Sequence, residues 1–161
     1  MKRLISLVLA LLLLSGCGII GERIKDPVTF YYIRADYQKD MGEVIVSEIR
    51  EASGHRDDLP YLLALYSMGP SNEDLIFPLP KNVSIIPIER TDRAITLNVS
   101  TPSQELSEAD FTLTSACIAL TCMELTDVDQ VTVVSGDRDI TIQEENLLMY
   151  SHTQQLQEEN K

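Results

Sequence analysis

The sequence predicts an α+β fold, in which a mixed β-sheet of about five to six strands carries two helices packed on one face. Segments rich in β-branched and aromatic residues occur both before and after two segments with helical spacing of apolar residues. Strands and helices therefore do not alternate strictly along the chain. The region after the N-terminal leader has the size of one ordinary domain with a single core, so we expect one domain and not two.

Strands are predicted where β-branched and aromatic residues run together or alternate with polar ones. In chain order they are 28–33, 43–52, 83–89, 94–99, 131–134 and 140–142, with 147–150 as a candidate last strand. The first of them is expected to be central, with both faces partly covered. Pro87 cannot donate a hydrogen bond to a ladder, so the strand that contains it is expected at an edge. Residues 90–93 are short enough for a hairpin turn into the next strand.

The first helix is predicted between two clear local signals. Asp57 or Asp58 can cap its N-terminus, and Pro60 fits the first turn. Gly69-Pro70 is expected to end it. The apolar face of this helix consists of Leu59, Leu62, Leu63 and Tyr66.

The second helix is predicted to begin after Ser107, which has acidic Asp110 at the capping-box distance, and to run to about Leu125. Apolar side chains nearly surround this helix, so we expect it to be deeply packed. These positions are Phe111, Leu113, Ala116, Cys117, Ile118 and Leu120.

The N-terminus has the features of a lipoprotein export signal. Met1 is followed by two basic residues, and residues 4–14 are almost continuously apolar. The Leu14-Ser15-Gly16-Cys17 sequence that follows resembles the lipobox of bacterial lipoproteins, in which a peptidase cuts before the cysteine and its thiol is acylated. We therefore predict that Cys17 carries the lipid that anchors the protein in the bilayer, at the extracytoplasmic face of the bacterial cell membrane.

An uncleaved membrane helix is the alternative interpretation, because residues 4–20 are apolar or small throughout. Gly16, Gly18 and the intervening cysteine make this run a poor spanning helix. The predicted organisation is a signal peptide (1–16), a lipidated cysteine with a spacer (17–27), a folded domain (28–150) and a polar tail (151–161).

The mature chain is expected to be acidic. Removal of sixteen residues from 161 leaves 145 and takes away two basic side chains, so the net charge changes from −12 to −14. Nucleic acid and anionic lipid headgroups require clustered Lys and Arg, so neither is an expected partner of the domain surface. Cys117 and Cys122 are five residues apart in one predicted helix, too far for a disulfide, and are expected to be buried apolar side chains.

No pattern in the sequence points to a catalytic site, and we predict neither an enzyme nor a cofactor. A Gly-rich phosphate loop, a Gly-x-Ser-x-Gly elbow and a Cys-x-x-Cys motif are all absent from the sequence. His55 falls in a predicted surface turn and His152 in the polar tail, so neither is placed for base catalysis.

Two pairs of acidic residues are candidate calcium ligands. Asp127 with Asp129, and Asp137 with Asp139, offer carboxylate oxygens of the kind that bind Ca²⁺ in loops. Neither pair lies within the full twelve-residue calcium-loop pattern, so solvated loops are favoured and no metal site is predicted.

Several short motifs in a fixed order resemble the GerMN domain, also called the sporulation and spore germination domain. They are Tyr31-Tyr32, Leu62-Leu63-Ala64-Leu65, Gly69-Pro70, Leu79-Pro80, Ile95-Thr96-Leu97-Asn98-Val99-Ser100 and Val131-Thr132-Val133 before Gly136. The resemblance covers roughly residues 28–136. It implies a non-enzymatic envelope module of bacterial lipoproteins, linked to spore assembly or germination, and it carries over no catalytic residues.

Three hypotheses about function follow. The first is a lipid-anchored module that docks another envelope protein or a second copy of itself, with the edge strand around Pro87 as the expected contact. The second is an enzyme that acts on peptidoglycan, and the third is a lipoprotein that binds wall fragments.

Overall fold

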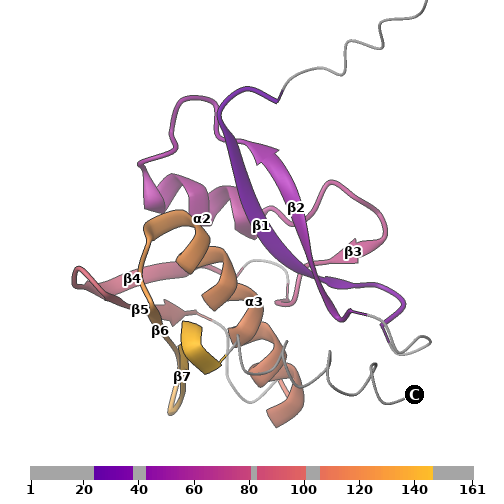
Figure 1. Ribbon diagram of the computed structural model, residues 1–161. Helices are drawn as coiled ribbons and strands as arrows, with labels where there is room; N and C mark the ends of the chain where they lie inside the picture. The colour runs from indigo at the N-terminus through magenta and orange to yellow at the C-terminus, as the bar shows by residue number, and fades with distance from the viewer. Residues whose placement is uncertain (1–23, 38–42, 81–82, 101–105, 147–161) are drawn as a thin grey trace, which may run out of the picture.

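A computed structural model of the chain describes residues 24–37, 43–80, 83–100 and 106–146 (Figure 1). Its elements in chain order are β1 (Pro27–Arg34), β2 (Ile45–Glu51), α2 (Leu59–Ser67), β3 (Leu75–Ile76), β4 (Ile85–Arg90), β5 (Ala94–Val99), α3 (Glu108–Thr126), β6 (Gln130–Ser135) and β7 (Arg138–Gln143). The predicted α+β class is confirmed, since strands both precede and follow the two helices. The sequence pattern does not predict β3, which has only two residues.

The described strands form two sheets where the sequence predicts one. Sheet A is antiparallel with the order β2-β1-β3, and sheet B has the order β4-β5-β6-β7. In sheet B the β5–β6 pair is parallel and the other two pairs are antiparallel, so the predicted mixed sheet is confirmed for this half of the fold. The helix α3 joins the parallel pair, because parallel neighbours need a long crossover between them.

The β1 strand pairs with β3 only at Ile33 and Arg34, and side-chain hydroxyl groups bind the same edge of β1 at Tyr31, before that pairing begins. The Arg34 N–H donates to Val44 O, in the segment that leads into β2, and backbone groups alternate in direction along a strand. The backbone groups of Tyr31, three residues earlier, therefore point away from β2. The Tyr31 N–H donates to Thr121 Oγ1 of α3 at 3.0 Å, and its carbonyl accepts from the Tyr66 hydroxyl of α2 at 3.0 Å. A neighbouring strand is therefore not needed to satisfy these groups.

Both helices lie between the two sheets (Figure 1), where the prediction places them on one face of a single sheet. The helix α3 packs on β1 of sheet A and on β6 and β7 of sheet B, and α2 packs on β4. On the other side α2 presents Tyr66 to Phe30 and Tyr32 of β1, with ring centroids 5.6 Å and 5.0 Å apart. This aromatic cluster is fully buried and fixes α2 against sheet A.

The first helix begins and ends as the sequence predicts. Asp58 is the N-cap, with its carboxylate accepting from Tyr61 N–H at 3.1 Å, and proline occupies the first turn. Gly69 follows the helix with φ of +85°, a conformation that favours glycine, and its N–H donates to Tyr66 O. The predicted apolar face, Leu59, Leu62, Leu63 and Tyr66, is buried.

The second helix is capped by Ser107, whose hydroxyl oxygen accepts from Asp110 N–H at 3.1 Å. Its deep packing is confirmed only on part of its circumference. Thr114, Ser115 and Thr121 are buried together with Phe111, Cys117 and Ile118, whereas three of the predicted apolar positions are only half-buried. These three are Leu113, Ala116 and Leu120.

The strand with Pro87 lies at the free edge of sheet B, as predicted. The candidate strand 147–150 and the cleavage and lipidation site at Cys17 lie outside the described residues. Within the ranges that are described, neither helix combines the length and the apolar character needed to cross a bilayer.

Candidate functional site

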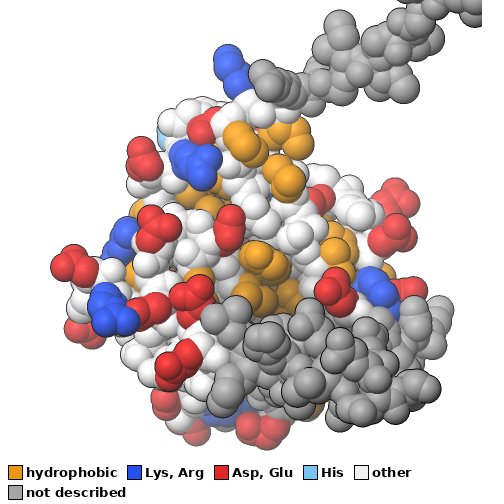
Figure 2. Space-filling view, in the orientation of Figure 1, with side chains coloured by type: hydrophobic (Ala, Val, Ile, Leu, Met, Phe, Trp, Pro, Cys, Tyr) orange, Lys and Arg blue, Asp and Glu red, His pale blue; other side chains and the backbone are white. Residues whose placement is uncertain are grey.

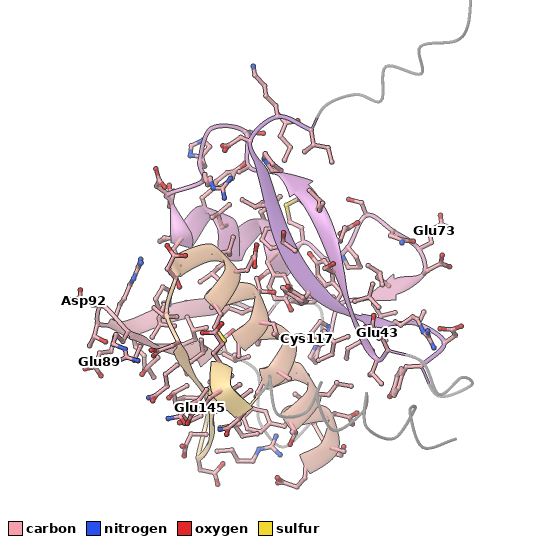
Figure 3. The ribbon with its side chains drawn as sticks, in the orientation of Figure 1. Glu43, Glu73, Glu89, Asp92, Cys117 and Glu145 are labelled. Atoms are coloured by element: carbon pink, nitrogen blue, oxygen red, sulfur yellow. The ribbon has the colours of Figure 1, made fainter. Side chains whose placement is uncertain are left out.

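The buried reactive groups of the domain belong to its core. Cys117 and Cys122 are free thiols on α3, and burial raises the pKa of each to about 12, so both stay protonated and unreactive. Burial also raises the pKa of the Tyr66 hydroxyl, which is hydrogen-bonded to β1. The prediction that both cysteines are buried and unpaired is confirmed. Figure 3 shows Cys117 between α3 and sheet A, whereas the labelled carboxylates lie at the periphery.

The acidic pairs do not come together as ligand sets in the described part of the chain. Asp127 ends α3 in the left-handed conformation with φ of +56°, and Asp129 pairs with Arg93. Asp137 and Asp139 are exposed around the turn between β6 and β7. No group of three or more His, Cys, Asp or Glu side chains in the described ranges has a metal-binding arrangement.

His55 lies in an exposed turn, as predicted. Its ring stacks on Tyr61 with centroids 4.2 Å apart, and its Nδ1 lies 3.8 Å from a carboxylate oxygen of Asp58. Both partners belong to the start of α2, so the histidine supports a helix terminus and faces no cavity. His152 lies outside the described residues.

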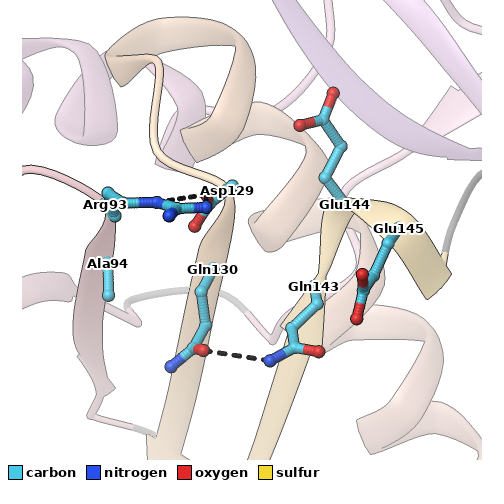
Figure 4. A pocket seen from close by; sticks show the side chains of 7 residues that line it. All are labelled: Arg93, Ala94, Asp129, Gln130, Gln143, Glu144 and Glu145. Carbon is cyan, nitrogen blue, oxygen red and sulfur yellow. Dashed lines mark hydrogen bonds and ion pairs between the residues drawn. The ribbon is translucent and has the colours of Figure 1, made fainter.

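A depression of about 490 Å³ opens at the end of sheet B where β5 and β6 begin and β7 ends (Figure 4). Its lining consists of Arg93, Ala94, Asp129, Gln130, Gln143, Glu144 and Glu145. The Gln143 side-chain Nε2 donates to the side-chain Oε1 of Gln130 at 3.1 Å, and Arg93 forms an ion pair with Asp129. The hydrogen bond and the charge of Asp129 raise the pKa of Arg93. The floor is therefore made of amides and a neutralised ion pair.

Two carboxylates at the rim of this depression, Glu144 and Glu145, are exposed. Carboxylate oxygens accept hydrogen bonds, so this rim is suited to hydrogen bonds from hydroxyl or amino groups.

A second depression, of about 160 Å³, lies beside the start of β1 and the end of α3. Arg56 donates to the Pro27 carbonyl oxygen across it at 3.1 Å. Ligand pockets usually measure at least roughly 300 Å³, so this one is too small for an organic ligand.

Exposed apolar side chains distinguish both sheets. Ile86 and Ile88 on β4 are 50% and 61% exposed, and Ile49 on β2 and Ile76 on β3 are 55% and 42% exposed. Figure 2 shows hydrophobic side chains on one face of the molecule between scattered carboxylates. The sequence did not predict these exposed positions. The alternation of side chains along a strand defines two faces, but it does not show which face another element covers.

The described elements thus define a small α+β domain whose candidate functional features are surfaces and a shallow polar depression. Comparison with models of protein families and with curated proteins gave no match. Two solved structures that the chain resembles are the tandem GerMN domains of the sporulation protein GerM from Bacillus subtilis and the first GerMN domain of that protein.

The two structures differ in how much of each chain is matched. The tandem structure has 22% identity and a TM-score of 0.47, and the match covers 76% of this chain and 43% of that one. The first-domain structure has 15% identity and a TM-score of 0.46, with 70% of this chain and 86% of that one covered. The chain therefore spans less than half the length of the tandem structure, and no site residue is transferred from either.

Proposed function

We propose that this protein is a non-enzymatic, lipid-anchored module of the bacterial envelope that docks another envelope protein or a second copy of itself, in sporulation or germination. The lipobox-like sequence at Cys17 supports the anchoring. The order of motifs that resembles GerMN domains supports the link to sporulation or germination. The role of docking rests on the exposed apolar side chains of β4.

The observation that carries the docking role is the outer surface of β4. Ile86 lies opposite Asn98 on the outer face of sheet B, and Ile88 falls at the irregularity between Pro87 and Glu89. Two large apolar side chains that are at least half exposed at the free edge of a sheet cost hydrophobic free energy unless a partner covers them. At roughly 25 cal/mol per Å², burying them in an interface would stabilise a complex by a few kcal/mol.

Cross-linking in cells tests this role. A photoreactive amino acid at position 88 of the full-length chain should capture one specific protein, whereas the same amino acid at Thr141, on the exposed β7, should not. Adding Ile86→Asp to the position-88 variant should reduce the captured product at least several-fold, because a charge cannot be buried in an apolar contact without a large cost.

The docking proposal would be contradicted by equal capture from positions 88 and 141, or by a product that Ile86→Asp leaves unchanged. Ile86 and Ile88 are exposed, so the folded state should tolerate the changes. Circular dichroism of the purified variants checks that the domain is intact before the yields are compared.

Binding of wall fragments is a second candidate, favoured by the depression lined with Gln130, Gln143 and the two exposed glutamates. Amides and carboxylates are suited to a ligand rich in hydroxyl and amino groups. Soluble muropeptides should then raise the melting temperature in a concentration-dependent way, and Gln130→Leu should abolish that rise. An unchanged melting temperature at millimolar muropeptide would remove this candidate.

A further inference from the structure

The outer face of sheet A is apolar, where a sheet face turned to solvent is usually polar. The β1–β2 and β1–β3 registers place on it, opposite the core face of Phe30 and Tyr32, six largely apolar residues: Tyr31, Ile33, Ile45, Ser47, Ile49 and Ile76. Towards the start of β1 the same face continues with Thr29 and with Pro27 opposite the charged Glu51. Ile49 and Ile76 remain 55% and 42% exposed.

The helix α3 extends this surface beyond the edge of β1. Leu113, Ala116 and Leu120 share one side of the helix and are half-buried. The next residue, Thr121, accepts the hydrogen bond from Tyr31 N–H, so this side of the helix adjoins the outer face of the sheet. Figure 2 shows hydrophobic side chains over β1, β2 and the adjoining part of α3. We call the six sheet residues and these three helix residues the A/α3 surface.

One segment of the chain has both the composition and the position to cover this surface. Residues 144–146 form a helical turn after β7, and this turn lies beside α3 in Figure 1. Glu144 N–H donates to Asp129 O, which fixes the chain close to the C-terminal end of α3. The next four residues in the sequence are Leu147, Leu148, Met149 and Tyr150, all apolar.

We propose that the A/α3 surface is the docking site of the chain's own segment 147–150. Four extended residues span up to roughly 13 Å. A tethered segment acts at an effective concentration of roughly millimolar, so modest apolar burial is sufficient. The nine residues of the surface include no Lys or Arg for anionic lipid headgroups and no acidic residue, which matches an uncharged apolar segment, while Glu51 and Glu124 lie at its margin.

The A/α3 surface is distinct from the exposed surface of β4. This inference is independent of the proposed docking at β4, since the two surfaces share no residue.

Cysteine cross-linking in the full mature chain tests the inference. Cys17→Ser removes the lipidated thiol, and Cys117 and Cys122 are buried and do not react. Ala116→Cys with Leu148→Cys, and Ser47→Cys with Leu148→Cys, should each give an intramolecular product with a short bismaleimide. The matched control, Glu89→Cys with Leu148→Cys, places the probe on the exposed strand β4 of sheet B and should give roughly tenfold less product, because this site lies away from the A/α3 surface and is not a near neighbour of Leu148 in the sequence.

Three results would overturn the inference. Equal yields from positions 116, 47 and 89 would mean that the segment samples all surfaces alike. Products that join two chains would show that a second copy occupies the surface. A yield at 116 that is unaffected when Leu147 and Tyr150 are both changed to Asp would show that apolar docking does not position the segment, whereas changing Gln154 and Gln155 to Asp is the neutral control.

The same experiment separates this inference from the proposed function. The Ile86→Asp variant should leave the intramolecular products at positions 47 and 116 unchanged. Absence of specific capture from position 88 together with intact intramolecular cross-links would contradict the β4 proposal alone, whereas specific capture without those cross-links would contradict the A/α3 inference alone.

Discussion

The Thr121 hydroxyl binds the part of the β1 edge that β3 does not cover. It is buried, and it accepts the hydrogen bond from Tyr31 N–H that would otherwise go to a neighbouring strand. A buried backbone donor without a partner costs roughly 1–3 kcal/mol, so a hydroxyl in this position stabilises the edge far more than its small size implies. The Tyr66 hydroxyl has the corresponding role for the Tyr31 carbonyl oxygen.

Thr121→Val should therefore destabilise the domain by ~1–3 kcal/mol, because valine keeps the shape of the side chain and removes the acceptor. Chemical denaturation of the soluble mature chain measures the change in the free energy of unfolding. The matched control is Thr112→Val on the exposed side of the same helix, where the hydroxyl donates to Glu108 O, and it should change stability by less than ~0.5 kcal/mol. Equal effects at the two positions would contradict the role of Thr121.

Burial of the two thiols predicts how the stability of the domain changes at alkaline pH. The folded-state pKa of Cys117 and Cys122 is raised from 9.0 to about 12 by burial. Their contribution to stability is fully present below pH 9, where the thiols are neutral in both states, and it is lost as pH rises towards 12, because only the unfolded chain ionises them readily. Stability should fall over this window, and the Cys117→Ala/Cys122→Ala variant should lose less of its own stability there.

Thiol reactivity checks the same environment at pH 8. In the Cys17→Ser chain the remaining two thiols should not react with a disulfide reagent until denaturant is added, and then both should react. Rapid labelling of the native chain would show that α3 is more exposed than its packing between the sheets allows.

At the scale of elements, β4 combines an exposed apolar surface with a protected backbone edge. Ser100 N–H donates to Ser84 O, so the backbone groups of Ser84 point towards β5. Because this direction alternates along an antiparallel strand, the backbone groups of Pro87 point away from β5, towards solvent. Proline has no N–H to offer there, and the register shift beside it makes the edge irregular. Docking at β4 should therefore use side chains and not the addition of a strand.

Pro87→Thr should restore a donor to this edge and increase self-association, because an exposed ladder with apolar neighbours is a template for pairing. Sedimentation velocity over a range of concentrations measures the change relative to the unaltered chain. Ile86→Thr, which keeps the proline and removes an apolar side chain, should not increase association. A Pro87→Thr variant with unaltered sedimentation would show that the edge is protected by other means.

Local signals predicted most elements, because capping, turns and alternation act within a few residues. The caps at Asp58 and Ser107 and the edge position of Pro87 follow from such signals. The division into two sheets does not, since it depends on hydroxyl groups that meet β1 from helices far along the sequence. The exposed isoleucines were missed for the same reason, because coverage of a strand face is decided by tertiary packing.

At the scale of the whole molecule, the proposed anchor and the acidic surface act in opposite directions. A net charge of −14 for the mature chain repels the domain from anionic headgroups, so attachment would depend on the lipid alone. A single acyl chain binds a membrane only weakly and reversibly, whereas the chains of a diacylglyceryl-cysteine hold a soluble domain stably.

Cys17→Ser should therefore move the protein out of the membrane fraction, because no other expected feature of the mature chain binds lipid. Fractionation of cells that express the full-length chain measures the distribution. Cys122→Ser is the matched control, since it also removes one thiol and should leave the protein membrane-bound. If the Cys17→Ser protein instead stays tightly bound and is extracted only by detergent, residues 4–20 act as an uncleaved membrane helix, and both lipidation and the sixteen-residue signal peptide are wrong.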